Sequence, residues 1–249
     1  MSDTVRPAAT VVLLRDTDAG IETFIMRRVA SMAFAPNMHV FPGGRVDEVD
    51  VRERVHFIHS DAATLAARGS ADEAGISALY SCAVRETAEE AGIVIAKRDL
   101  EGRLSIDPRA LPIVDHWVTP ETESHRYDVR FFAAAVADGQ ASLTTTEADQ
   151  AGWISPAEAL AQFAAGRMAM LPPTESVLLR LTSFSSAGDF LSDARERVVV
   201  PLLPRQLADD DGRLRWALVH DRTGDVLVDR IRMPHTRETD GRPTEEPLP

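Results

Sequence analysis

One predicted helix carries the feature that most constrains this chain: three glutamates within five positions, in Ala83-Val-Arg-Glu-Thr-Ala-Glu-Glu-Ala-Gly-Ile93. At about 100° per residue, the side chains of Glu86, Glu89 and Glu90 share an arc of about 100° on one face of that helix. The apolar side chains that precede them fall on the neighbouring arc, so the helix can bury one stripe and still present three acids to a cleft.

Three like charges at spacings of three and four repel one another on an isolated helix. A hard divalent cation compensates this repulsion, because carboxylate oxygens suit Mg²⁺ or Mn²⁺. Arg85 is a second compensator, since it lies four positions before Glu89. For an arbitrary acidic helix a solvated charged face is the commoner outcome, so the helix alone leaves both interpretations open.

A glycine pair follows a short predicted extended segment in Val40-Phe-Pro-Gly-Gly44. Gly43 and Gly44 would let the backbone approach a phosphate or a metal-bearing helix closely, although a plain turn is the alternative. The chain contains no G-x-G-x-x-G and no P-loop, so nucleotide binding through those devices is not supported. The glycine pair gains weight only in combination with the acidic helix.

In that combination the sequence resembles the Nudix hydrolases, whose signature is G-x5-E-x7-R-E-U-x-E-E-x-G-U, with U a bulky apolar residue. Gly44 matches the first glycine of the signature. Its second half is matched by Arg85-Glu86, Glu89-Glu90, Gly92 and Ile93.

Three departures separate the chain from that signature. Between Gly44 and Arg85 lie 40 residues, about 27 more than the signature allows, and the insertion falls at about 51–77. Asp50 stands where the signature has its first glutamate, and Thr87 replaces its first bulky apolar residue. A Nudix-fold sensor that binds a nucleotide-like ligand without cleaving it is therefore an alternative, which the two replacements favour and the complete acidic triad opposes.

The resemblance implies a divalent-metal-dependent hydrolase that cleaves the pyrophosphate bond of a nucleoside diphosphate linked to another group. Bound Mg²⁺ or Mn²⁺ would neutralise the phosphate oxygens and acidify a water. The resemblance makes Glu86 and Glu90 the metal ligands and Glu89 a ligand or the general base. Arg85 would hold Glu89 in place, and the glycine pair would bring the backbone close to the metal site.

Four further residues are weaker candidates. Glu147, in the segment before Trp153, would supply another acid, and an exposed loop acid is an equal alternative. Arg28 and Arg45 would supply positive charge for phosphates, with surface solvation as the alternative for each. Trp117 would stack on a base, but a lone tryptophan on a strand is more often part of the core.

Motifs outside the signature resemble the Nudix branch that contains peroxisomal coenzyme A diphosphatases, which also carries a long insertion inside the signature. The motifs are Trp117-Val-Thr-Pro120, Arg126-Tyr-Asp128, Phe131-Phe132 and Leu171-Pro-Pro-Thr174. This resemblance implies coenzyme A or an acyl-coenzyme A as the substrate, with ADP-ribose or NADH as the alternative. The coenzyme A motif of some relatives has an arginine and a glycine where this chain has Ala33 and Asn37.

The element pattern and the resemblance together predict an α/β (α+β) fold of the Nudix type. It is an α/β/α sandwich around a mixed β-sheet, with a C-terminal extension of a helix plus strands. Residues 1–170 would form the Nudix hydrolase domain, and residues 171–233 an extension packed on it. Residues 234–249 contain four prolines and one large apolar side chain, which predicts a flexible tail.

Within that fold the strands are predicted at 10–14 and 22–27, which form a hairpin, and at 113–118, 127–136, 153–154, 198–203, 214–220 and 226–231. One helix is predicted at 61–68 and another at 174–184. The acidic helix begins at a capping box of Ser70 and Glu73 and ends at Gly92, and a further helix begins at the N-cap Ser155.

Composition limits the partners and the compartment. The chain has 27 basic and 39 acidic residues, and the net charge of −12 disfavours nucleic acid as a partner. No run of about 20 apolar residues predicts a membrane span, and the N-terminus lacks the features of a signal peptide. The single cysteine, Cys82, excludes an intramolecular disulfide. We therefore expect a cytoplasmic protein, and exposed strands in 187–249 would be natural pairing edges for a homodimer.

Overall fold

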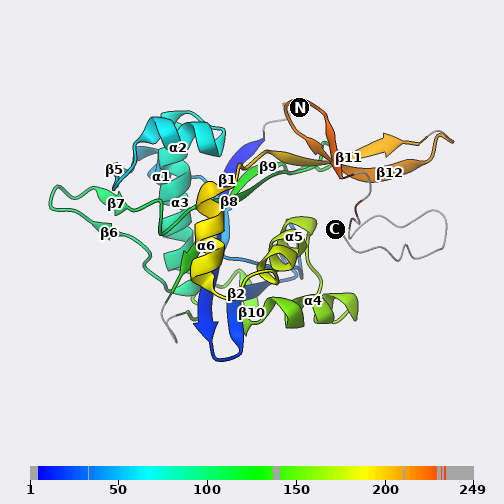
Figure 1. The fold of residues 1–249 in the computed structure, drawn as a ribbon, viewed down its shortest axis with the longest axis horizontal. Coiled ribbons are helices and arrows are strands. Elements are labelled where there is room, and N and C mark those ends of the chain that lie inside the picture. Colours follow the sequence, from blue (N-terminus) through cyan, green and yellow to red (C-terminus); the bar gives the residue numbers. More distant parts are fainter. Residues whose placement is uncertain are drawn as a thin grey trace.

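The computed structural model describes residues 5–32, 34–136, 141–209, 211–228, 231 and 233. Within these ranges the chain forms a ten-stranded mixed sheet, a separate three-stranded sheet and six helices (Figure 1). The predicted tail at 234–249, and Ala33, lie outside the described residues.

The elements alternate irregularly along the chain. The strands are β1 Arg6–Thr17, β2 Gly20–Arg28, β3 His39–Val40, β4 Gly43–Arg45, β5 Val55–Phe57, β6 Lys97–Arg98, β7 Leu104–Ile106, β8 Ile113–Val118, β9 Tyr127–Ala135, β10 Ala148–Ile154, β11 Leu202–Ala208, β12 Leu214–His220 and β13 Val226–Val228. The helices are α1 Glu48–Arg52, α2 Ala62–Gly69, α3 Glu73–Ala91, α4 Pro156–Ala164, α5 Pro172–Leu181 and α6 Ala187–Glu196.

Strand β1 lies in the middle of the large sheet, whose order is β10-β2-β1-β9-β8-β11-β12-β13. It runs antiparallel to β2 and parallel to β9, and its run of aliphatic residues is fully buried. Because alternate side chains of a strand point to opposite faces, Val11 and Leu13 pack with α3 while Val12 and Leu14 pack with α5 and α6. Helices therefore cover both faces of the sheet, which confirms the predicted sandwich.

The acidic helix α3 begins at a side-chain cap and ends at a glycine. The Asp72 carboxylate accepts a hydrogen bond from the Gly75 N–H at 2.6 Å, and Gly92 ends the helix in the left-handed region at φ 67°. The predicted end at Gly92 is confirmed, but the predicted capping box is wrong. Ser70 instead closes α2 with φ 53°, so the aspartate two positions later caps α3.

Several other predicted boundaries shift. The strands at 113–118 and 214–220 are confirmed, and Ser155 caps α4 by accepting the Glu158 N–H at 3.2 Å. The strand predicted at 198–203 is displaced to Leu202–Ala208, and Val198 is exposed in the segment after α6. Helices α1 and α6 and the sheet β5-β7-β6 were not predicted.

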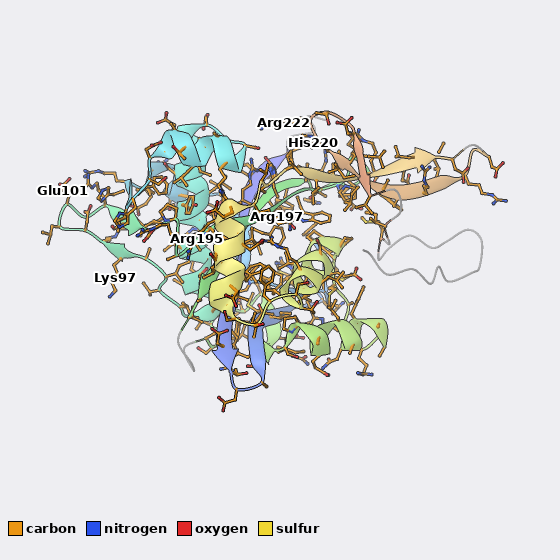
Figure 2. All side chains as sticks on the ribbon, viewed as in Figure 1. Lys97, Glu101, Arg195, Arg197, His220 and Arg222 are labelled. Atoms are coloured by element: carbon orange, nitrogen blue, oxygen red, sulfur yellow. The ribbon has the colours of Figure 1, made fainter. Side chains whose placement is uncertain are left out.

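The insertion and the C-terminal region are tied to each other. Arg68 of α2 donates hydrogen bonds to backbone carbonyls at the end of α6, including those of Arg195 at 2.5 Å and Arg197 at 3.0 Å. Arg222, in the turn after β12, donates to the Ser70 carbonyl at 3.0 Å. Arg195, Arg197 and Arg222 lie along this junction in Figure 2. Among the described residues, no helix combines the length and the apolar character needed to cross a membrane.

Candidate active site

The glycine pair lies in β4, which pairs with β1 and packs against α3. Thr10 is paired with Gly43, and Ala9 with Gly44. The Gly43 N–H donates a hydrogen bond to Oε2 of Glu90 at 2.7 Å. A Cβ on Gly44 would lie 2.3 Å from Oε1 of Glu86. Neither glycine has a positive φ. Glycine at position 44 permits the close approach of the Glu86 carboxylate, and glycine at position 43 permits the close approach of the β1 backbone.

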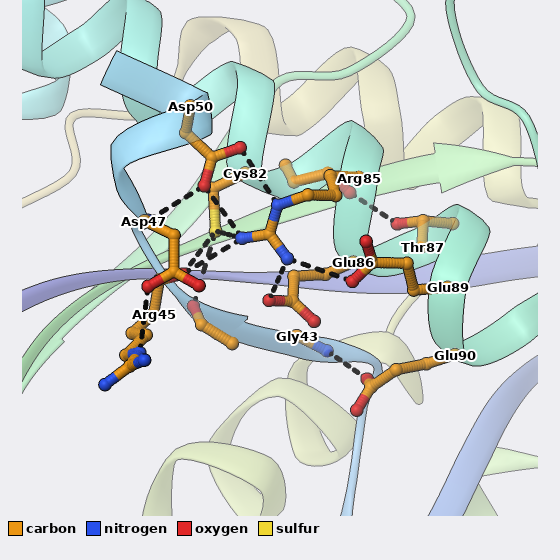
Figure 3. A network of polar contacts seen from close by, with 12 residues as sticks. Gly43, Arg45, Asp47, Asp50, Cys82, Arg85, Glu86, Thr87, Glu89 and Glu90 are labelled. Carbon is orange, nitrogen blue, oxygen red and sulfur yellow. Dashed lines mark hydrogen bonds and ion pairs between the residues drawn. The ribbon is translucent and has the colours of Figure 1, made fainter. Parts of the chain in front are cut away.

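Glu86 and Glu90 point to the same part of the structure, where the Glu86 carboxylate contacts Arg85 and the Glu90 carboxylate contacts Gly43 (Figure 3). Glu90 is 4% exposed, and the Glu86 side chain is 14% exposed. Burial raises the pKa of Glu86, and it raises the pKa of Glu90 to about 7, against the opposing effect of the Gly43 N–H. The negative charge of Glu86 raises the pKa of Glu90 further. Arg85 compensates the charge of Glu86 at 2.7 Å, whereas Glu90 forms no ion pair with the described residues.

Arg85 connects the remaining acids. Its guanidinium binds both oxygens of Asp50, at 2.7 and 3.1 Å, in a bidentate ion pair. One of its terminal nitrogens also binds Oε1 of Glu86 at 2.7 Å and Oε2 of Glu89 at 3.0 Å. The hydrogen bond to Asp50 raises the pKa of Arg85, so this cation is permanent. Glu89 is the most exposed of the three glutamates and is turned toward Arg85, the contact that the i, i+4 spacing predicted.

Asp50, at the position of the first glutamate of the signature, is 2% exposed. Besides Arg85, it accepts hydrogen bonds from the Ser81 hydroxyl at 3.2 Å and from the Asp47 N–H at 2.9 Å. Helix α1 thus carries this carboxylate to Arg85 at the point where the insertion begins. Aspartate at this position, shorter than the glutamate of the signature, is thus accommodated by α1, a helix that was not predicted from the sequence.

The second replacement is also accommodated. Thr87 is fully buried, and its hydroxyl donates to the Ala83 carbonyl at 2.7 Å inside the helix, so its methyl group can face the core. Cys82 lies beneath the glycine strand, where its sulfur is 3.5 Å from the Gly44 oxygen and 3.3 Å from the Arg45 oxygen. Burial raises the pKa of the Cys82 thiol, so it is a packed donor and no nucleophile.

Glu147 and Arg28 lie beside Glu90. A terminal nitrogen of Arg28 is 3.9 Å from Oε2 of Glu147, and the charges of both residues act on the pKa of Glu90, in opposite directions. The Nε atom of Arg28 is buried and has no hydrogen-bond partner within the described part of the chain.

Thr144 was not singled out from the sequence, but its hydroxyl donates a hydrogen bond to the backbone of α3 in this region. Backbone acceptors leave no signal in a sequence, so this contact could not be predicted.

Two predicted substrate-binding residues do not join this group. Trp117 is 2% exposed and packs in the core on the α5 and α6 side of the sheet, so it presents no ring face to a base, and that prediction is corrected. Arg45 is exposed and forms an ion pair with Asp47 at 2.9 Å.

Asn37 stands where the coenzyme A motif of some relatives has a glycine. Its backbone lies in the left-handed region at φ 61°, a conformation that asparagine tolerates better than most residues.

The donor set fits a cation of the magnesium type. Within the ranges the structure describes, no three histidine, cysteine, aspartate or glutamate side chains converge to hold a metal ion by themselves. Mg²⁺ is commonly bound through one or two carboxylates and completes its shell with water and substrate phosphates. The buried pair Glu86 and Glu90 meets that description, and a cation there would relieve their repulsion.

The sandwich fold, with its acidic helix facing a glycine strand, defines the Nudix class of proteins. The family model described as "NUDIX domain" matches residues 4–173, and the chain belongs to this family.

Two relatives agree with this assignment. The crystal structure of a NUDIX hydrolase from Alicyclobacillus acidocaldarius is similar with a TM-score of 0.64 and 28% sequence identity, and the match covers 77% of this chain and 97% of that chain. The Caenorhabditis elegans protein named "Putative nudix hydrolase 7" is 26% identical over 215 residues, which cover 81% of this chain and 68% of the relative. The family and these relatives make the protein a pyrophosphohydrolase.

Proposed function

We propose that the protein is a divalent-metal-dependent hydrolase of a nucleoside diphosphate linked to another group, with Glu86 and Glu90 as the ligands of Mg²⁺ or Mn²⁺. The observation that carries this proposal is the buried carboxylate pair against the glycine strand, in which the pKa of Glu90 is raised to about 7. Arg85 pairs with Glu86, but Glu90 forms no ion pair with the described residues, and a buried carboxylate costs stability unless a cation neutralises it.

The other residues of the site have separate roles in this proposal. Arg85, fixed by Asp50, orients Glu86 and Glu89, and Glu89 is an additional ligand or the general base. Glu147 is the second candidate for the base, because it lies beside Glu90 and is more than half exposed. Arg28 supplies positive charge beside Glu90 and Glu147 for the phosphate oxygens. The bound cation supplies charge neutralisation of the pyrophosphate and acidification of a water.

For the substrate we propose coenzyme A or an acyl-coenzyme A, with ADP-ribose or NADH as the alternative. The support is the branch resemblance of the downstream motifs. Asn37 stands where the coenzyme A motif of some relatives has a glycine, and it adopts the left-handed backbone conformation that glycine favours. This replacement therefore does not oppose a coenzyme A substrate.

We also propose that residues 1–170 are the catalytic domain and that residues 171–233 are an extension packed on it. The family match ends at residue 173, and α5 and α6 share a hydrophobic core with β1 and β8. We further propose a cytoplasmic location and a homodimer through the extension. The compartment in which the native protein is found and its molecular mass in solution would test these two proposals.

The test is a turnover panel of coenzyme A, acetyl-coenzyme A, ADP-ribose and NADH, with Mg²⁺, with Mn²⁺ and with chelator. Glu86→Gln and Glu90→Gln are compared with Glu73→Gln, a matched change in the first turn of the same helix. We expect metal-dependent cleavage of the pyrophosphate, seen by mass spectrometry as two phosphomonoester products, and its loss in the first two variants only. Unchanged turnover in both would refute the ligand assignment, and tight binding without products would favour a sensor.

A further inference from the structure

The last carbonyls of α3 are bound by a distant segment of the chain. An α-helix leaves its final carbonyls without partners inside the helix. Here the Thr144 hydroxyl donates to the Glu89 carbonyl at 2.7 Å, and the Thr144 N–H donates to the Glu90 carbonyl at 3.1 Å. The Ser142 N–H donates to the Ala91 carbonyl at 3.0 Å. Residues 142–144 therefore cap the helix end that carries the site acids.

The same segment is fixed at its other end beside the site. The Glu147 carbonyl accepts the Val29 N–H at 2.9 Å, and the Glu147 N–H donates to the Thr145 hydroxyl at 3.1 Å. The Glu147 carboxylate faces Arg28 at 3.9 Å. Thr144, which binds the α3 backbone, thus lies three residues before Glu147, whose carboxylate lies at the site. We call residues 142–147 the strap.

We propose that Thr144 is a positioning residue, which sets the place of Glu147 relative to Glu90 by anchoring the strap to α3. The inference rests on the proposed function, because it gives Glu147 a part in the reaction. The side-chain bond matters because it acts on the carbonyl of Glu89 itself, one residue before Glu90. A shift of the strap along the helix would carry Glu147 with it.

Two substitutions separate the role of the Thr144 hydroxyl from that of its methyl group. Its Cγ2 methyl lies over the end of the helix, 3.3 Å from the place where a Cβ on Gly92 would stand. Thr144→Val keeps the shape and removes the hydroxyl donor, whereas Thr144→Ser keeps the donor and removes the methyl. Both variants retain the two backbone hydrogen bonds, so neither is expected to unfold the protein.

Kinetics on the substrate found in the panel test the proposal. A misplacement of about 1 Å at a reacting group can lower a rate about a hundredfold, so we expect Thr144→Val to lower kcat by on the order of tenfold or more with little change in KM. Thr144→Ser should restore kcat. In a Glu147→Gln background, Thr144→Val should have no further effect, because its target is already removed. Full kcat in Thr144→Val, a full additional loss in the double variant, or full kcat in Glu147→Gln would each overturn the proposal.

Amide hydrogen exchange in the metal-free protein separates this inference from the proposed function. Thr144→Val should raise exchange in 142–148 and leave β1 unchanged, while Thr144→Ser should match the wild type. Unchanged exchange in Thr144→Val overturns the anchor whether or not the protein cleaves any substrate. If the wild type cleaves none of the panel, the proposed function fails, and the positioning role fails with it.

Discussion

Gly44 gives the sharpest prediction, because the three heavy atoms nearest to an added methyl group all belong to the carboxyl group of Glu86. In Gly44→Ala the new Cβ would lie 2.3 Å from Oε1 of Glu86 and 2.6 Å from its Cδ. Ordinary contact begins near 3.4 Å, so the carboxylate must move by about 1 Å. The end of a glutamate side chain can move at small cost, and we expect unfolding free energy to fall by about 1 kcal/mol or less.

Activity should respond far more than stability. If Glu86 binds the cation as proposed, a displacement of its carboxylate by about 1 Å predicts a loss of about a hundredfold in kcat/KM. Steady-state hydrolysis with Mg²⁺ and urea unfolding, measured on the same preparations, give the two quantities.

Two other glycines provide the comparison. A Cβ on Gly43 would lie 2.4 Å from the Ala9 carbonyl oxygen, which is fixed in the sheet, so Gly43→Ala should cost about 3 kcal/mol of stability. Gly152 has open space around it, and Gly152→Ala should change neither quantity. Near wild-type activity in Gly44→Ala, at unchanged stability, would show that the Glu86 carboxylate has no fixed role in the reaction.

Three further predictions concern the supports of the site and the fold. Asp50→Asn strips Arg85 of its buried counter-charge and should cost about 3 kcal/mol in urea unfolding; a cost below about 1 kcal/mol would disprove that support. Arg68→Met loses the carbonyl contacts at the end of α6 and should lower Tm by about 4 °C, with faster amide exchange in α6 but not in α4. Asp128, whose pKa is lowered to about 2 by His116 and Arg130 despite its partial burial, stabilises the fold above pH 4. That stability, up to about 2 kcal/mol after allowance for its partial exposure, is lost as pH falls from about 4 to 2, and Asp128→Asn should flatten this limb of the pH curve.

The sequence was sufficient for elements whose signal is local. The acidic helix, the hairpin of β1 and β2 and the strand β8 follow from periodicity and turn residues, and Gly92 ended its helix as predicted. The arc shared by Glu86, Glu89 and Glu90 also follows from helix geometry alone.

Other features depend on contacts between distant residues and were missed. Ser70 and Glu73 had the spacing of a capping box, but the left-handed turn after α2 used Ser70, and Asp72 was the better cap. Helix α6 had a recognisable signal in its N-cap Ser186 and the apolar positions 190, 191 and 194, which was overlooked beside the strand-like run that follows it.

The site shows the same division. Helix spacing does not tell which of the three carboxylates is buried. Their burial depends on the glycine strand, which contacts Glu90 and Glu86 although 40 residues separate Gly44 from Arg85 in the sequence. Trp117 was mispredicted because an aromatic residue on a strand gives no signal of the face that it occupies.

The central claim is that Glu86 and Glu90 together bind a divalent cation, and titration with Mn²⁺ followed by electron paramagnetic resonance tests it most directly. The account predicts that the wild-type protein and Glu73→Gln bind Mn²⁺ with equal affinity, and that Glu86→Gln and Glu90→Gln each weaken binding by at least about tenfold. Equal Mn²⁺ affinity in all four proteins would contradict the account.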